Sequence, residues 1–261
     1  MKLMFIYTFQ SEWLKRKRSL ASRMIITGAF FTPVVIIVAR LMRKDYLTVV
    51  YADPAFWKHL WSSAWESMAV FLLPLGAVLL TSLLTQLEFK NNTWKQVHTL
   101  PLRLSTIYFT KLSVILVMLL QFILLFTVGV LISGYLPALL TGTKIQALSF
   151  SLIGQFLNED LSYFICLLPI VVSQYTISLF YKNFLVPVGI GFIGWVSALS
   201  MLSWRYALIF PYTYVIQRYL HSTGKGGLTV SVTGLTYISL AWFILITVTG
   251  YLLYQLKKEK G

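Results

Sequence analysis

The chain has 261 residues, of which 57% are hydrophobic and only 11% are charged. This composition lies far outside the range of soluble domains, so it excludes a soluble globular protein. Basic residues outnumber acidic ones by 22 to 8. Because no basic domain stands apart from the apolar runs, this excess indicates membrane topology and anionic lipid headgroups and argues against nucleic-acid binding.

The first element expected in chain order is a helix over residues 1–19. Ile6, Phe9 and Trp13 recur at helical spacing, and a basic cluster follows at residues 15–18. This pattern is typical of a helix that lies in the membrane interface. The alternative is a basic flank that only fixes topology. The segment lacks a small-residue cleavage site, so we expect the next apolar run to be a retained span and not a signal peptide.

Six apolar runs follow, and each is long enough, at about 20 residues, to cross a bilayer as a helix. The runs are continuously apolar and lack the alternation of a β-barrel wall. We therefore predict an all-α polytopic membrane protein, with residues 1–261 forming a single transmembrane domain. The predicted spans are residues 20–39, 67–87, 112–134, 161–180, 184–203 and 237–256. Prolines inside the spans permit kinks or flexing, and they are Pro33, Pro74, Pro169 and Pro187.

An even number of spans places both termini on the same side of the membrane. With both termini in the cytoplasm, most of the 22 basic residues fall in inner segments, as the positive-inside rule requires. Acidic residues lean outward, Glu159 and Asp160 among them. Arg40, Arg43 and Lys44 run against the rule, because this topology puts them outside. We predict a multi-pass protein with both termini cytoplasmic.

A polar segment, residues 88–103, separates the second and third predicted spans and offers a handle for a water-soluble partner. Thr93 and Gln96 fit the capping-box pattern of a helix start, and Pro101 disfavours helical geometry at the residue before it. The pattern predicts a helix of about two turns, which is too short to be stable alone. Its apolar edge must therefore dock, either under its own bundle or on a partner.

Polar side chains within the predicted spans are few. Arg23, Glu66 and Lys111 lie near span ends, where they can reach the interface. This placement disfavours an ion-coupled carrier and an intramembrane enzyme. Four further polar residues either hydrogen-bond between helices or line a translocation path. They are Gln121, Ser173, Gln174 and Thr176.

Two connections between later spans have contrasting lengths. Residues 181–183 are so few that the fourth and fifth predicted spans must form a tight antiparallel hairpin. Residues 204–219 form a longer outer segment whose aromatic density, from Trp204 to Tyr219, is typical of a belt at the headgroup level. The alternative is a shallow reentrant lid over an exit path, supported by Pro211.

Motifs for nucleotide chemistry and metal binding are absent from the sequence. No phosphate-binding loop ends in Gly-Lys-Ser or Gly-Lys-Thr, so we expect that the chain does not hydrolyse ATP itself. Gly189, Gly191 and Gly194 spell G-x-G-x-x-G inside an apolar span with no preceding strand, so close helix packing explains them better than a dinucleotide site. The three histidines lie in separate loops, and we expect no metal site.

The sequence combines an interfacial first helix, six spans and a short capped helix that ends Thr99-Leu100-Pro101. With this combination it resembles the permease subunits of type-2 ABC exporters over almost the whole chain. Residues 88–111 are the most specific part, because an acidic residue leaving the second span, a Trp-bearing helix and a Leu-Pro pair resemble the coupling segment of that family. Chain size and the Asn-Asn-Thr-Trp-Lys-Gln run are most similar to permeases of lantibiotic self-protection (immunity) transporters.

The resemblance implies a transport subunit of a bacterial cell (inner) membrane, with no catalytic residue and no cofactor of its own, because ATP and magnesium bind a separate ABC ATPase. It implies two permease chains, identical or different, that move a hydrophobic or amphipathic substrate such as an antimicrobial peptide, a lipid or a drug. Trp94, Val97 and His98 would contact the ATPase, and Glu88 would orient the short helix. The coupling residues that it implies are Glu88, Phe89, Asn92, Trp94, Lys95, Val97, His98, Pro101, Tyr181 and Lys182. Two rival classes stay open, an ion-coupled secondary carrier and a non-transporting membrane scaffold.

Overall fold

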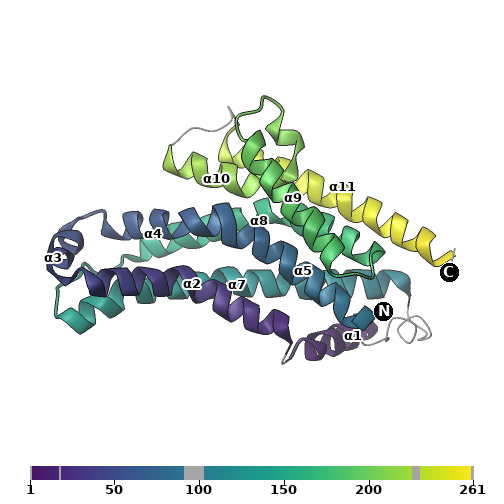
Figure 1. The fold of residues 1–261 in the computed structure, drawn as a ribbon, viewed down its shortest axis with the longest axis horizontal. Coiled ribbons are helices and arrows are strands. Elements are labelled where there is room, and N and C mark those ends of the chain that lie inside the picture. The colour runs from purple at the N-terminus through teal and green to yellow at the C-terminus, as the bar shows by residue number, and fades with distance from the viewer. Residues whose placement is uncertain (1, 18, 91–102, 225–229, 260–261) are drawn as a thin grey trace.

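The computed structural model describes residues 2–17, 19–90, 103–224 and 230–259, which form helices joined by turns and short connections (Figure 1). No strand occurs within these ranges, which confirms the predicted all-α class. The elements in chain order are α1 (Lys2–Lys15), α2 (Leu20–Met42), α3 (Lys44–Ala52), α4 (Phe56–Ser67), the π-helical turn η1 (Met68–Leu72), α5 (Leu73–Lys90), α7 (Leu104–Thr141), α8 (Phe150–Phe180), α9 (Leu185–Met201), the 3-10 turns η2 (Ala207–Ile209) and η3 (Pro211–Thr213), α10 (Tyr214–Thr223) and α11 (Val232–Glu259).

Five helical stretches in the described part of the chain are long and apolar enough to cross a membrane. They cover five of the six predicted spans, except for residue 87 of the second, and are Leu20–Met42, Phe56–Gln86, Leu104–Thr141, Phe150–Phe180 and Val232–Leu256. The remaining predicted span, residues 184–203, is helix α9. Its 17 residues extend about 25 Å, slightly less than the hydrocarbon core of about 30 Å. A sixth crossing therefore stays a prediction.

Helix α7 is much longer than the predicted span 112–134. Its 38 residues extend about 57 Å, so it must project beyond a hydrocarbon core of about 30 Å. The helix begins after Arg103, which has an extended backbone, and ends at Gly142. Gly142 has a φ of 69°, a backbone conformation that glycine adopts without the steric cost of a side chain.

Residues 56–66, which precede the second predicted span, are helical and run through η1 into α5. Trp57, Trp61 and Trp65 recur every four residues and are all buried, so one face of α4 belongs to the core. Trp65 stacks on Tyr163 of α8 with 3.7 Å between the ring centroids. The sequence analysis missed this helix because charged residues interrupt the apolar run.

The helices form an elongated bundle in which α7 packs along α2, and α8 packs against both α5 and α11. The start of α1, the end of α11, the end of α5 and the start of α7 lie toward one end of this bundle, and α3 lies at the opposite end (Figure 1). We call these the terminal end and the α3 end. This arrangement agrees with termini on a common side, while the compartment that each end faces stays a prediction.

Helix α1 forms where a helix was predicted, and its aromatic residues pack on the bundle. Phe9 and Trp13 stack with 5.9 Å between ring centroids, and both pack against the core, where α1 contacts α7. Ile6 remains 48% exposed. The helix is therefore docked on α7, and its location in the membrane interface stays a prediction.

The predicted aromatic belt at residues 204–219 is only partly an exposed surface. Trp204 and Tyr206 are about half exposed, but Tyr212, Tyr214 and Tyr219 are buried. The Tyr214 hydroxyl donates to the Leu208 carbonyl at 2.5 Å, and α10 packs against α8, α11 and η1. The second half of this segment therefore belongs to the core of the protein, because its phenol groups find acceptors there and its apolar face is covered.

Two ionisable residues lie deeper than the sequence analysis expected. Lys111 was expected to reach the interface, but it is 4% exposed on α7. Asp160 was expected in an outer loop, but it belongs to α8 and is also 4% exposed. The Thr127 hydroxyl of α7 donates to Asp160 Oδ2 at 2.6 Å. This donor satisfies one of the two carboxyl oxygens, while the buried Oδ1 has no hydrogen-bond partner among the described residues.

Candidate functional site

The terminal end brings together two segments that the sequence analysis assigned to ATPase coupling. The Gln86 amide, on the last turns of α5, donates to the Tyr181 carbonyl at 2.7 Å. Tyr181 is 45% exposed, and Lys182 and Asn183 beside it are exposed as well. Asn183 Oδ1 accepts the Leu185 N–H at 3.0 Å, which holds the turn between α8 and α9. The last turns of α5 and this exposed turn therefore lie side by side.

The remaining predicted coupling residues fall at the edge of the described structure or beyond it. Glu88 and Phe89 belong to the last turn of α5, so the polar segment leaves the second span as a continuation of a helix. The other predicted coupling residues lie outside the described residues, and they are Asn92, Trp94, Lys95, Val97, His98 and Pro101. Their contact with an ATPase stays a prediction.

A buried tyrosine cluster joins three helices where α7 resumes after the polar segment. Tyr108 of α7 donates its hydroxyl to the Thr247 carbonyl of α11 at 3.3 Å, and Tyr175 of α8 donates to the Tyr108 carbonyl at 3.0 Å. The Tyr108 ring also lies 5.5 Å from Tyr251 and 5.8 Å from Tyr254, both on α11. These contacts tie the first turns of α7 to both α8 and α11.

The sequence analysis included Tyr108 only within the range 88–111 and missed this cluster. The only signal was the recurrence of tyrosine near the ends of three separate apolar runs. Nothing in the sequence showed that these three ends meet.

Gln174 is the centre of a buried polar layer that joins α5, α8 and α9. Its amide donates to Ser82 Oγ at 2.9 Å and to the Pro187 carbonyl at 2.6 Å, and Tyr212 donates to its Oε1 at 3.4 Å. The side chain is completely buried. The sequence analysis left two roles open for Gln174, hydrogen bonding between helices or lining a translocation path. The structure shows the hydrogen bonds between helices.

The other three predicted path residues do not gather around Gln174. Ser173 and Thr176 donate to carbonyls of their own helix, at 2.7 and 2.8 Å. Gln121 is exposed on α7 and accepts a hydrogen bond from Arg16 at 3.1 Å. Arg16 also lies over the Trp13 ring, 3.0 Å from its centroid, and burial lowers the pKa of its guanidinium. Gln121 thus helps to fix α1 on α7.

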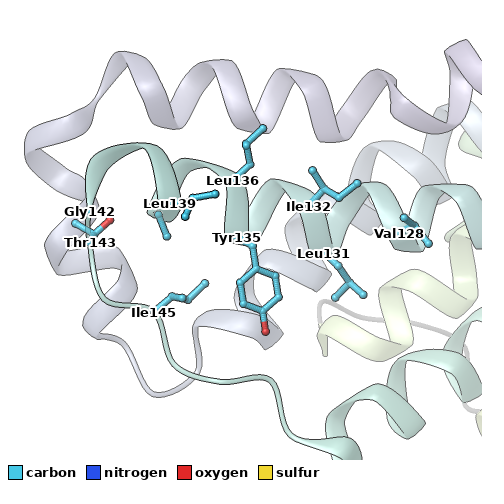
Figure 2. Close-up of a pocket in the computed structure, with 10 residues that line it drawn as sticks. Val128, Leu131, Ile132, Tyr135, Leu136, Leu139, Gly142, Thr143 and Ile145 are labelled. Carbon is cyan, nitrogen blue, oxygen red and sulfur yellow. The ribbon is translucent and has the colours of Figure 1, made fainter.

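The α3 end contains an apolar recess of about 700 Å³ between the last turns of α7 and residues 142–145 (Figure 2). Leu131, Tyr135 and Leu139 line it from the helix, and Ile145 lines it from the returning chain. Tyr135 lies 4.8 Å from Trp57, centroid to centroid. The recess can hold an acyl chain or an apolar side chain, but its apolar walls offer no group for bond-breaking chemistry.

Among the residues that the structure describes, no group of three or more His, Cys, Asp or Glu side chains is placed to hold a metal ion. The geometry instead supplies a helical membrane bundle, an exposed turn beside the end of a span, and a tyrosine cluster that links three helices. These features define a polytopic membrane protein.

The chain belongs to the family described as ABC-2 family transporter protein, whose model matches residues 8–198. Permeases of this family are membrane-spanning transport subunits that work with ABC ATPase partners. The comparison with curated proteins gives no match. Family membership supports the type-2 ABC permease resemblance, and it favours a transporter over a scaffold.

Proposed function

We propose that this chain is the permease subunit of an ATP-driven exporter, with two permease chains forming the path and two ATPase subunits bound at the terminal end. The observation that carries the proposal is the junction of the α5 end with the exposed Tyr181 turn, in a chain of this family. Closure of the ATPases would push on this junction and on the polar segment. The tyrosine cluster would pass that displacement to α8 and α11.

The proposed substrate is hydrophobic or amphipathic, such as an antimicrobial peptide of the lantibiotic type, a lipid or a drug. The apolar recess at the α3 end supports this class, because its walls match acyl chains or apolar side chains. The proposed orientation, in a bacterial cell membrane, has both termini and the terminal end in the cytoplasm.

The first experiment replaces Trp94 with Asp and measures how much ABC ATPase co-purifies with the permease. We expect a large loss of the ATPase, because a carboxylate cannot enter an apolar contact without a large desolvation cost. Trp204→Asp is the matched control, since Trp204 is 48% exposed beyond the other end of α9. Undiminished association of the Trp94 variant would remove the coupling assignment.

The second experiment measures ATP hydrolysis by the purified complex in liposomes while peptides, lipids and drugs are added singly. A substrate should stimulate hydrolysis and accumulate on the far side of the membrane. Transport that persists without ATP and collapses with the ion gradient would contradict the proposal.

A further inference from the structure

The α3 end also contains a mixed crevice where α2, α3 and α4 meet, with a volume of about 560 Å³. Ile36, Val50 and Leu60 form apolar walls, and Arg40 and Arg43 reach it from the end of α2. We call it the α2–α3–α4 crevice. The proposed function does not use it, and it contains two of the basic residues that run against the positive-inside rule.

The Arg40 guanidinium is held in place on one wall of the crevice. It lies 4.9 Å from the Phe56 ring centroid and 5.6 Å from that of Tyr51, and its Nη1 donates to the Ser133 carbonyl at 2.9 Å. A guanidinium carries five N–H donors, so Arg40 can bind an anion and keep its contact with Ser133. Arg43 is exposed at the mouth of the same crevice.

The acidic residue of the crevice, Asp53, contacts groups other than the two arginines. Asp53 Oδ1 accepts the Ala55 N–H at 2.8 Å, and its Oδ2 lies 3.6 Å from His59 Nε2. Within the described part of the chain, neither Arg40 nor Arg43 forms an ion pair with a carboxylate. The crevice therefore combines two guanidinium groups and an apolar wall with one carboxylate, which is paired with His59.

The position of the crevice indicates which anion reaches it. Helix α2 is apolar over its length and ends at Met42, so Arg40 and Arg43 lie where a span of about 20 residues meets the headgroup layer. Val35 and Val38, which precede Arg40 by five and two residues, are about half exposed and would face acyl chains. A phosphate diester attached to acyl chains matches both parts of the crevice, since guanidinium groups bind phosphate oxygens in paired geometry.

We propose that the α2–α3–α4 crevice is a phospholipid-binding site, in which Arg40 and Arg43 bind the phosphate and the apolar wall receives an acyl chain. This inference goes beyond the proposed function and holds whichever compartment the α3 end faces. The arginines at this end then serve a ligand and not the topology of the chain.

The test titrates the purified full-length chain in detergent with phosphatidylglycerol and measures bound lipid by native mass spectrometry. Diacylglycerol with the same acyl chains is the comparison lipid, because it lacks only the phosphate headgroup. We expect Arg43→Gln to weaken phosphatidylglycerol binding about tenfold, as the loss of a charged hydrogen bond predicts. Arg43 is exposed, so this variant should fold. Arg205→Gln removes an exposed arginine outside the crevice and should leave binding unchanged.

Three results would overturn the proposal. Equal binding of diacylglycerol and phosphatidylglycerol would mean that only the apolar surface retains lipid. Equal losses in the Arg43 and Arg205 variants would mean that surface charge alone is responsible. The third result is that Arg43→Gln abolishes a dimer of the chain and leaves the amount of bound lipid unchanged. The crevice would then bind a second copy of the chain and not a phospholipid.

Discussion

Gly191 and Gly189 lie two residues apart on α9, and they offer a matched pair for measuring how tightly the bundle is packed. A methyl group built on Gly191 would lie 2.5 Å from Val78 Cγ1 and 2.7 Å from Gln174 Oε1. A methyl group built on Gly189 would meet nothing within 4 Å. Alanine at position 191 should therefore force α9 away from α5 and α8, while alanine at position 189 should not.

The size of the effect follows from these distances. Ordinary contacts begin near 3.4 Å, so Val78 would have to retreat by about 1 Å, and its β-branched side chain has little rotamer freedom to do so. Overpacking of this kind costs about 1–3 kcal/mol. The gain in helix propensity from glycine to alanine is up to about 1 kcal/mol and is common to both variants, so it cancels in the comparison.

Thermal unfolding in detergent, followed by tryptophan fluorescence, measures this difference. For a chain of this size, 1 kcal/mol corresponds to about 2–4 °C in the unfolding temperature, so Gly191→Ala should unfold about 2–12 °C below Gly189→Ala. Trp195 is a local reporter, because its indole N–H donates to the Val70 carbonyl at 2.7 Å. Equal unfolding temperatures would refute the close packing of α9 against Val78 and Gln174.

Two further substitutions test buried polar contacts by the same unfolding measurement. Asp160→Asn keeps an acceptor for the Thr127 hydroxyl and should cost less than Asp160→Ala. The alanine removes this hydrogen bond between helices, at about 0.5–1.5 kcal/mol, and leaves the hydroxyl only the Ile123 carbonyl of its own helix, at 3.1 Å. Equal losses would show that the hydrogen bond to Asp160 contributes nothing. Trp195→Phe removes the donor to the Val70 carbonyl and should cost about 1–3 kcal/mol. The stability lost in Trp195→Phe should be smaller when Pro74 is also replaced by alanine, because residue 74 then has an N–H that can donate to the Val70 carbonyl. An equal loss in both backgrounds would contradict the assignment of this carbonyl to Trp195.

The spans could be predicted from the sequence because a run of about 20 apolar residues is itself the physical requirement for crossing a bilayer. The helix preceding the second span was missed since Lys58, His59 and Glu66 break the apolar run, although the buried tryptophans recur every four residues. Their spacing was visible in the sequence. However, α4 is apolar only on the face that carries these tryptophans, so it does not form a continuous apolar run.

The buried polar groups could not be placed from the sequence, because their partners lie on other helices. Asp160 Oδ2 accepts from the Thr127 hydroxyl, and the Gln174 amide donates to Ser82 Oγ and the Pro187 carbonyl. The tyrosine cluster depends in the same way on three helix ends that meet only in the folded chain. For the candidate site, the sequence located the exposed turn at Tyr181, but the hydrogen bond from Gln86 that ties this turn to α5 required the structure.

Prolines in the helices act as attachment points for neighbouring helices as well as kinks. Proline has no N–H, so the carbonyl four residues earlier loses its usual donor. Pro74 frees the Val70 carbonyl, which accepts from Trp195 of α9, and Pro137 frees the Ser133 carbonyl, which accepts from Arg40 of α2. Each freed acceptor is thus paired with a donor from another helix, as burial away from water requires. These contacts fix α9 against the π-helical turn before α5 and α2 against the last turns of α7, so the same prolines that interrupt one helix specify which neighbour packs beside it.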